Sequence, residues 1–148
     1  MIVVAIPLDA MKRVYHENPC TATMFALYEV TGHRKDVRYR LIDTRLNPWE
    51  KAGGKMVQDP DMKACECPSD LSADAYHVSE HYMVLQAIGK TDYLLVDNYC
   101  LNTLYSLKNV GIKIYKIPPF AKDVETAINH FIIGVEIADN LQHIHPAS

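Results

Sequence analysis

Five short apolar stretches along the chain have the composition and spacing of β-strands. They cover residues 2–6, 24–31, 36–43, 93–96 and 112–117. The first and the fourth are apolar at every position, which is typical of strands buried on both faces of a sheet. The third alternates between two faces, with Val37, Tyr39 and Leu41 on one and Arg38, Arg40 and Ile42 on the other. Because only the short turn at residues 32–35 separates the second stretch from the third, we expect the two to form an antiparallel hairpin.

Three further segments carry apolar residues at helical spacing. They cover residues 72–88, 101–110 and 124–133, and each is predicted to stop at a glycine, Gly89, Gly111 or Gly134. Ser72 and Asp123 precede the first and the last of them and are residue types that cap helix N-termini. Between the hairpin and the first helix, residues 44–71 contain three prolines and show no apolar period. A segment of this kind in a compact domain is usually a functional or mobile loop.

The order of these elements predicts an α/β fold. Strands that alternate with helices require parallel pairing with right-handed crossovers, whereas the hairpin requires antiparallel pairing. Both conditions are met by a mixed five-stranded sheet with flanking helices, of the ribonuclease H-like kind. No internal repeat or linker divides the chain, so we expect a single domain at residues 1–134 and a C-terminal extension at 135–148.

Composition narrows the partners of this domain. The 148 residues are 49% hydrophobic and carry a formal net charge of -3, which gives no electrostatic attraction to nucleic acid or to an anionic membrane. The N-terminus lacks the basic region of a signal peptide, and no apolar stretch is long enough to cross a bilayer. The chain is therefore predicted to be cytoplasmic, where thiols stay reduced. Its four cysteines are then better interpreted as candidate metal ligands than as disulfides.

Two pairs of candidate ligands lie close together in the sequence. Cys65 and Cys67 are two residues apart in the long loop, where they can present two thiolates to one soft metal. His77 and His81 are one helical turn apart, a spacing that suits two imidazoles on one metal. The alternatives are two ordinary loop thiols and an exposed polar helix face. The stretch from His77 to His81 also matches the HxxEH pattern of inverted zinc peptidases, but those need a larger fold.

Cys20 and Cys100 form a third pair, one that depends on the fold. Cys20 lies between the first two strands, and Cys100 lies just past the fourth. If the first and fourth strands are parallel neighbours, both cysteines lie at the carboxyl edge of the sheet, where open α/β sheets bind ligands. The alternative is that each cysteine packs in the core as a small apolar residue.

A metal-dependent nuclease or hydrolase is a further alternative that the fold class suggests. Asp9, Glu80 and Asp97 fall near the positions where a two-metal site needs carboxylates. Asp9, however, lies beyond the end of the first strand, and no fourth carboxylate is evident.

Three segments of the chain resemble the dinitrogenase iron–molybdenum cofactor biosynthesis family, the group of NifX, NafY and the C-terminal domain of NifB. Residues 2–9, IVVAIPLD, are similar to the opening IAIPVD of the family, and residues 24–30, MFALYEV, to its YFAIYEV. Residues 104–128 are similar to its closing LxxxGIKVY…VEEAI. The likeness spans most of the chain, from residue 2 to about residue 131.

The resemblance implies a ribonuclease H-like fold without nuclease activity, and we expect the protein not to be an enzyme. The resemblance also implies a binding or carrier protein for an iron–sulfur or iron–molybdenum cluster, which a protein donor or acceptor exchanges with it. Where relatives read HFGRAP, this chain has Asn18 in place of the histidine and Cys20 in place of the glycine, with His16 two residues earlier. Where relatives read GIGP after the fourth strand, Cys100 replaces a glycine.

These replacements suggest a thiolate variant of the family's site, because thiolates are good ligands for clusters. Its cofactor-binding residues would be Cys20, Cys100, His16 and Asn18. The metal ligands would be Cys20 and Cys100, with Cys65, Cys67, His77 and His81 as supplementary ligands. The remaining hypothesis is a regulatory or interaction domain that binds no metal.

Overall fold

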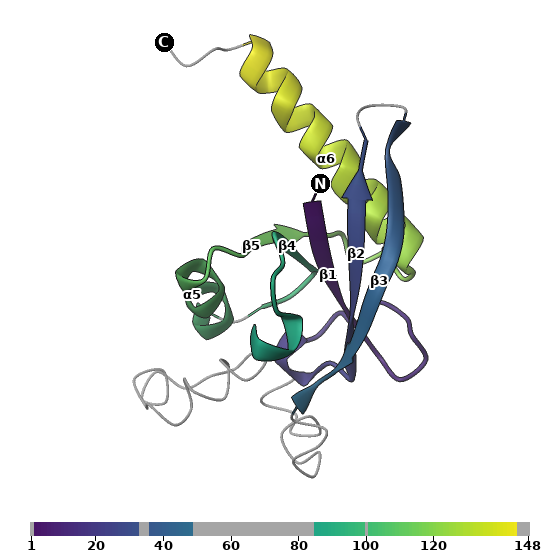
Figure 1. Ribbon diagram of the computed structural model, residues 1–148, viewed down its shortest axis with the longest axis vertical. Helices are drawn as coiled ribbons and strands as arrows, with labels where there is room; N and C mark the ends of the chain where they lie inside the picture. The colour runs from purple at the N-terminus through teal and green to yellow at the C-terminus, as the bar shows by residue number, and fades with distance from the viewer. Residues whose placement is uncertain (1, 33–35, 49–84, 100, 145–148) are drawn as a thin grey trace.

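The computed structural model describes residues 2–32, 36–48, 85–99 and 101–144, and within them it contains one mixed five-stranded sheet (Figure 1). The strand order across the sheet is β3-β2-β1-β4-β5. The strands are β1 (Ile2–Leu8), β2 (Met24–Thr31), β3 (Arg38–Leu46), β4 (Tyr93–Val96) and β5 (Lys113–Lys116). The β1–β2 and β2–β3 pairs are antiparallel, whereas the β1–β4 and β4–β5 pairs are parallel. The predicted α/β class and the mixed five-stranded sheet are confirmed.

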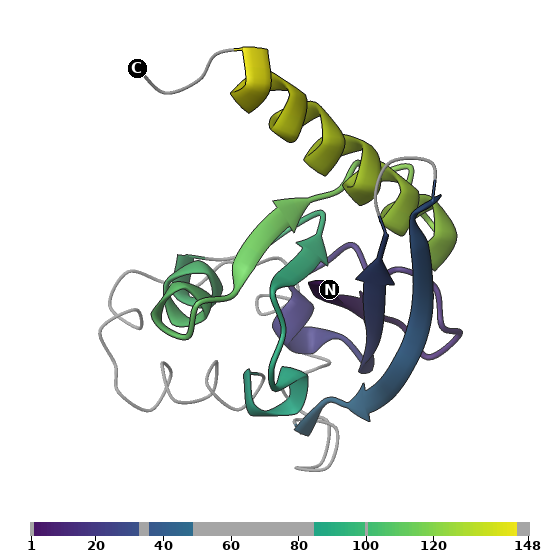
Figure 2. The same ribbon diagram turned by 45° about the horizontal axis from the view of Figure 1, so that its top comes forward.

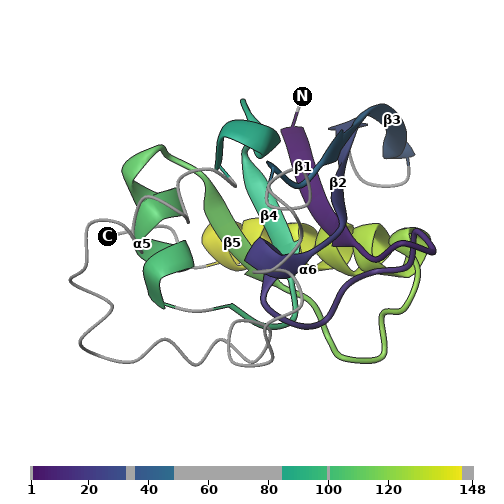
Figure 3. The same cartoon turned by 90° about the horizontal axis from the view of Figure 1, so that it is seen from below.

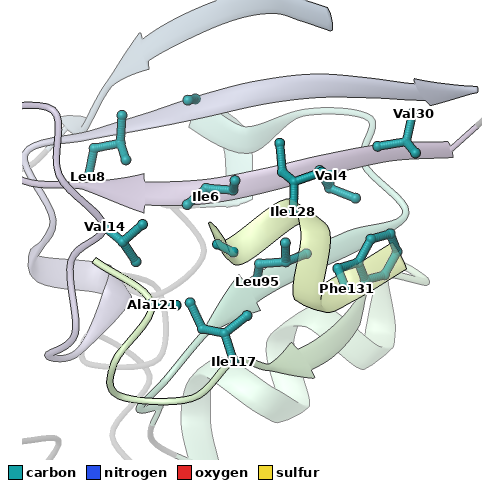
Figure 4. Close-up of a cluster of buried hydrophobic side chains, with 12 residues drawn as sticks. Val4, Ile6, Leu8, Val14, Val30, Leu95, Ile117, Ala121, Ile128 and Phe131 are labelled. Atoms are coloured by element: carbon teal, nitrogen blue, oxygen red, sulfur yellow. The ribbon is translucent and has the colours of Figure 1, made fainter. Parts of the chain in front are cut away.

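Helices lie on both faces of this sheet. Helix α6 (Val124–Ile144) packs on one face, where Ile128 and Phe131 contact Val4 and Ile6 of β1 in the same buried cluster (Figure 4). On the other face, Leu107 of α5 (Leu101–Asn109) and the helical turn at residues 85–88 join Ala5 of β1 in a second cluster. Burying each large side chain of this kind stabilises the fold by about 1.5–3 kcal/mol. Neighbouring residues of β1 thus belong to opposite cores, which explains why the strand is apolar throughout.

Two of the predicted helix ends are confirmed. Gly89 and Gly111 have φ values of 64° and 80°, in the left-handed region that glycine adopts without a steric penalty. The amide of Gly89 donates to the carbonyl of Leu85 at 3.0 Å, and the amide of Ile112 donates to the carbonyl of Leu107 at 3.0 Å. Both contacts cap carbonyls at a helix C-terminus. The predicted start at Ser72 lies outside the described residues.

The third predicted helix end is wrong, because α6 continues through Gly134 to Ile144 (Figure 2). Gly134 does not have a positive φ. A Cβ atom at this position would collide with the hydroxyl of Tyr115 on β5. The glycine therefore allows close packing between helix and strand instead of ending the helix. The boundary predicted between residues 134 and 135 falls inside α6, and the division into a domain and an extension stays a prediction.

The third strand also differs from its prediction, since β3 covers Arg38–Leu46 and not residues 36–43. The register shifts between Leu27 and Tyr28 of β2, which pair with Asp43 and Leu41 of β3. Ile42 is therefore the extra residue of a β-bulge. Residues 44–46, predicted to begin the long loop, extend the strand instead. Among the described residues, no helix combines the length and apolar composition that a bilayer crossing requires.

Candidate functional site

Three loops meet at one end of the sheet, where the parallel strands β1, β4 and β5 end. We define the carboxyl edge as residues 9–23 after β1, Asp97 after β4 and residues 117–122 after β5. Figure 3 views the molecule from below, with the loop after β1 near the ends of these strands. Backbone bonds link the loops, since the amide of Val14 donates to the carbonyl of Lys122 at 3.0 Å. Ligands of open α/β sheets bind at such an edge.

Asp9 shapes the first part of the loop after β1. Its Oδ1 accepts hydrogen bonds from the amides of Met11 and Arg13, each at 2.9 Å, and its Oδ2 accepts one from Nε of Arg13 at 3.0 Å. Partial burial acts to raise the pKa of Asp9, but these hydrogen bonds outweigh it and hold the pKa below its usual value. Both carboxylate oxygens, which a two-metal nuclease would need as ligands, are thus bound to the protein's own loop.

Cys20 lies in a short 3₁₀-helix, η1 (Pro19–Thr21), that closes the loop, and Asn18 is the residue directly before it. Oδ1 of Asn18 accepts from the amide of Cys20 at 3.1 Å, and the carbonyl of Asn18 accepts from the amide of Thr21 at 2.9 Å and from its hydroxyl at 2.7 Å. Asn18 is completely buried. Its side chain therefore caps the helix instead of facing an open binding site.

Asn47 is a site residue that the sequence did not reveal. It is completely buried after the end of β3, and its Nδ2 donates to the carbonyls of Cys20 at 2.8 Å and Ala22 at 2.7 Å. These bonds fix η1 to the far strand of the hairpin. The Asn18-Pro19 pair is a turn signal that could have indicated the cap. Asn47 carries no such signal, because its partners lie 25 or more residues away in the sequence.

The side chain of Cys20 points into the protein. It is 1% exposed and belongs to the buried cluster on the α5 face of the sheet, with Ala5, Phe25 and Val96 among its members. A thiol in such surroundings packs as a small apolar side chain. Coordination of a metal by this sulfur therefore requires η1 to move away from the core.

His16 connects all three loops of the carboxyl edge. Its Nδ1 lies 3.2 Å from Oδ2 of Asp97, and its Nε2 lies 2.8 Å from the carbonyl oxygen of Ala121. Both neighbours are oxygen atoms, so the ring nitrogens bridge a carboxylate after β4 and a backbone carbonyl after β5. The side chains are only partly exposed, 27% for His16 and 17% for Asp97. Both ring nitrogens are thus engaged within the protein, so metal binding by His16 would require one of these bonds to break.

The structure places His16, Asn18 and Cys20 in one loop, next to Asp97 at the end of β4. The other candidates lie outside the described residues. These are Cys65, Cys67, His77, Glu80, His81 and Cys100. Within the part of the chain that is described, no three His, Cys, Asp or Glu residues are arranged to hold a metal ion.

No family model, curated protein or solved structure matches the chain. The likeness to the cofactor biosynthesis family therefore stays a prediction made from three sequence segments. The function has to be inferred from the residues and from the geometry of the carboxyl edge.

A groove of about 650 Å³ lies at the opposite, amino end of the parallel strands. Val3, Asp92 and Ile112 line it at the strand starts, and Gly89 and Gly111 line it at two helix ends. Oδ2 of Asp92 accepts from the amide of Val3 at 2.8 Å, so part of its polar lining is already used in joining β1 to the turn before β4. Of the candidate ligands that the structure describes, His16, Asn18 and Cys20, none lines this groove.

Proposed function

We propose that this protein is a non-enzymatic binding or carrier protein for an iron–sulfur or iron–molybdenum cluster, held as cargo at the carboxyl edge. The observation that carries the proposal is the contact between His16 and Asp97. It joins the loop that contains Asn18 and Cys20 to the end of β4, and Cys100 follows Asp97 by three residues. The contact thus brings the loop that carries three of the proposed cluster-binding residues, His16, Asn18 and Cys20, to the end of β4.

The sheet gives this proposal a second line of support. The strand order β3-β2-β1-β4-β5, with β1 antiparallel to β2 and parallel to β4, is the arrangement expected of a ribonuclease H-like fold. We propose that the chain has this fold, and that a protein donor and a protein acceptor exchange the cluster with it.

Cys20 and Cys100 would hold the cargo through their thiolates. The described residues fit such a cargo only after a local change, because Cys20 is buried and Asn18 caps η1. Opening of η1 would break the two hydrogen bonds from Asn47 and expose the thiol. Each of these bonds contributes about 0.5–1.5 kcal/mol, and cluster binding would have to supply this free energy together with the cost of removing Cys20 from the core.

Anaerobic reconstitution with iron and sulfide tests the proposal. The wild-type chain should bind iron and gain visible absorption, and the double variant Cys20→Ala/Cys100→Ala should lose most of both. Alanine is used because serine would bury an added hydroxyl at position 20. Circular dichroism of both proteins controls for unfolding. Equal iron content in the folded wild type and double variant would overturn the proposal.

One observation favours a second candidate, an interaction domain without a metal. Cys20 is packed among apolar side chains, and both ring nitrogens of His16 are bonded to other parts of the chain. Both features indicate side chains that stabilise the fold and that already have their contacts within the protein. This candidate predicts that anaerobically purified protein carries no stoichiometric transition metal by elemental analysis and does not take up iron on reconstitution.

A further inference from the structure

The exposed apolar residues of this protein gather on one strand. Eight large hydrophobic side chains are exposed among the described residues, and four of them belong to β3. These are Tyr39, Leu41, Ile42 and Leu46. β3 is also an edge strand of the sheet, paired with β2 over its length and with no other described strand. Long edge strands with apolar side chains are templates for pairing with another chain.

The register separates the side chains of β3 into two kinds. Tyr39, Leu41 and Leu46 lie opposite Val30, Tyr28 and Met24 of β2, residues on the face that packs against α6. We call these three residues the apolar face of β3. The ring of Tyr39 contacts the ring of Tyr28 edge-on, with centroids 6.1 Å apart, so this face continues the core outward. Leu41 and Leu46 nevertheless stay 51% and 55% exposed.

The arginines of β3 lie on the other face. Arg38, Arg40 and Arg45 are opposite Thr31, Glu29 and Phe25 of β2, and we call these three residues the arginine face. Asp43 shares it, opposite Leu27. The bulge at Ile42 causes this arrangement, because Asp43 and Arg45 would fall on the apolar face if Ile42 were paired regularly with β2.

The charge of the arginine face is only partly balanced. Nη2 of Arg40 lies 3.2 Å from Oε2 of Glu29, and Nε of Arg45 lies 3.0 Å from Oδ2 of Asp43. Among the described residues no ion pair is found for Arg38, and the side chain of Arg40 stays 73% exposed. The face is therefore positive on a protein whose formal net charge is -3.

We propose that β3 binds an extended segment of another protein, added to the sheet edge as a sixth strand, in which acidic residues alternate with apolar ones. Side chains of an added strand alternate between the two faces of the sheet. Its apolar residues would cover Leu41 and Leu46, and its carboxylates would face Arg38 and Arg40. Strand addition supplies the main-chain hydrogen bonds, and the alternation supplies the specificity.

A second copy of this chain does not supply the acidic residues that the arginine face requires. Pairing β3 with β3 would place three arginines and one aspartate against an identical set, and like charges opposite each other destabilise a sheet. The inference does not rest on cluster binding, since none of the candidate cluster ligands belongs to β3.

Two synthetic peptides of about seven residues, with glutamate or lysine alternating with valine, test the proposal on the full chain. Fluorescence anisotropy should show that the glutamate peptide binds and the lysine peptide does not. Arg38→Glu/Arg40→Glu should weaken binding of the glutamate peptide by about tenfold or more. The matched control is Lys113→Glu/Lys116→Glu, which makes the same change of charge on β5 at the opposite edge and should leave binding unchanged. Absence of binding to the wild type, or equal loss in both variants, would overturn the proposal.

Backbone methylation separates strand addition from simple charge attraction. Amides of alternate residues in a strand point to opposite edges. Of two glutamate peptides, one methylated at the amides of its glutamates and the other at the amides of its valines, only one therefore loses the amides that face β3. One methylated peptide should bind and the other should not. Binding of both would overturn strand addition. A dimer in sedimentation that Leu41→Glu dissociates would instead identify a second copy as the occupant, and would equally overturn the proposal.

Discussion

The hydroxyl of Tyr115 on β5 occupies the space beside Gly134 where a larger residue would place its Cβ atom. The same hydroxyl donates to the carbonyl of His130 at 3.3 Å, one turn earlier in α6. Tyr115 also packs edge-on against Phe131, with ring centroids 5.1 Å apart. This contact holds the middle of α6 against the edge of the sheet, at a position where the sequence indicated the end of the helix.

Gly134→Ala should therefore destabilise the protein by about 1–3 kcal/mol, because the added methyl group overpacks the contact with Tyr115. In an unobstructed helix interior the same change stabilises the protein by about 1 kcal/mol. The sign of the change in the free energy of unfolding therefore shows whether the contact with Tyr115 is present. Urea denaturation measures it. Tyr115→Phe removes the nearest atom, so the double variant should recover part of the loss. A stabilised single variant would contradict the packing.

Asn47→Ala should destabilise by about 1–3 kcal/mol, because it leaves the buried carbonyls of Cys20 and Ala22 without their donor. Denaturation again provides the measurement. Asn98→Ala is the matched control, since Asn98 is an exposed asparagine and its removal should change the free energy of unfolding by less than about 0.5 kcal/mol. Equal effects at the two positions would refute the role given to Asn47.

His16→Ala should loosen the carboxyl edge without unfolding the sheet. It removes contacts to Asp97 and Ala121, which are worth about 1–3 kcal/mol in partly buried surroundings. Hydrogen exchange should then speed up for the amides of Val14 and Thr21, while amides of β1 stay protected. Met11→Ala, in the same loop and with a side chain that is 73% exposed, serves as the control. Unchanged exchange in His16→Ala would show that the histidine does not hold the loops together.

Asp9→Asn should make the thermal stability of the protein less dependent on pH in the acidic range. The folded-state pKa of Asp9 lies below its usual value of 3.8, so its contribution is fully present above pH 3.8. That contribution is lost as the pH falls through the lowered folded-state pKa. Thermal melts of the wild type and the variant should therefore differ most near neutral pH and converge toward strong acid. Curves that stay a constant distance apart would show that Asp9 is not the group responsible.

The sequence predicted the elements well where local chemistry decides them. Alternating or continuous apolar runs located all five strands, and Gly89 and Gly111 marked real helix ends because a left-handed backbone favours glycine. The helix end predicted at Gly134 was wrong for a physical reason. A glycine required by close packing and one required by backbone conformation look the same in a sequence, and only the position of Tyr115 distinguishes them.

The carboxyl edge was predicted less completely. The sequence placed Cys20 and Cys100 near the ends of β1 and β4, because the order of strands and helices requires those strands to be parallel. The structure confirms the parallel pairing, whereas Cys100 lies outside the described residues. The sequence indicated burial of Cys20 only as the alternative to metal binding, and it did not indicate that Asn47 fixes η1. Both depend on contacts between residues far apart in the chain, which no local pattern encodes. The bulge at Ile42 was missed for the same reason, since it shows only in the pairing with β2.

The bulge at Ile42 also lets β3 differ in length at one point without changing the face of any other side chain. Substitution of Ile42 would leave every other side chain of the strand on its present face. Deletion of that one codon would place Asp43 directly after Leu41, so the two would pair regularly with Leu27 and Tyr28 and keep their faces. A natural lineage of this protein should therefore vary in residue type at position 42, and the loss of a single residue should be tolerated there more readily than elsewhere in the strand.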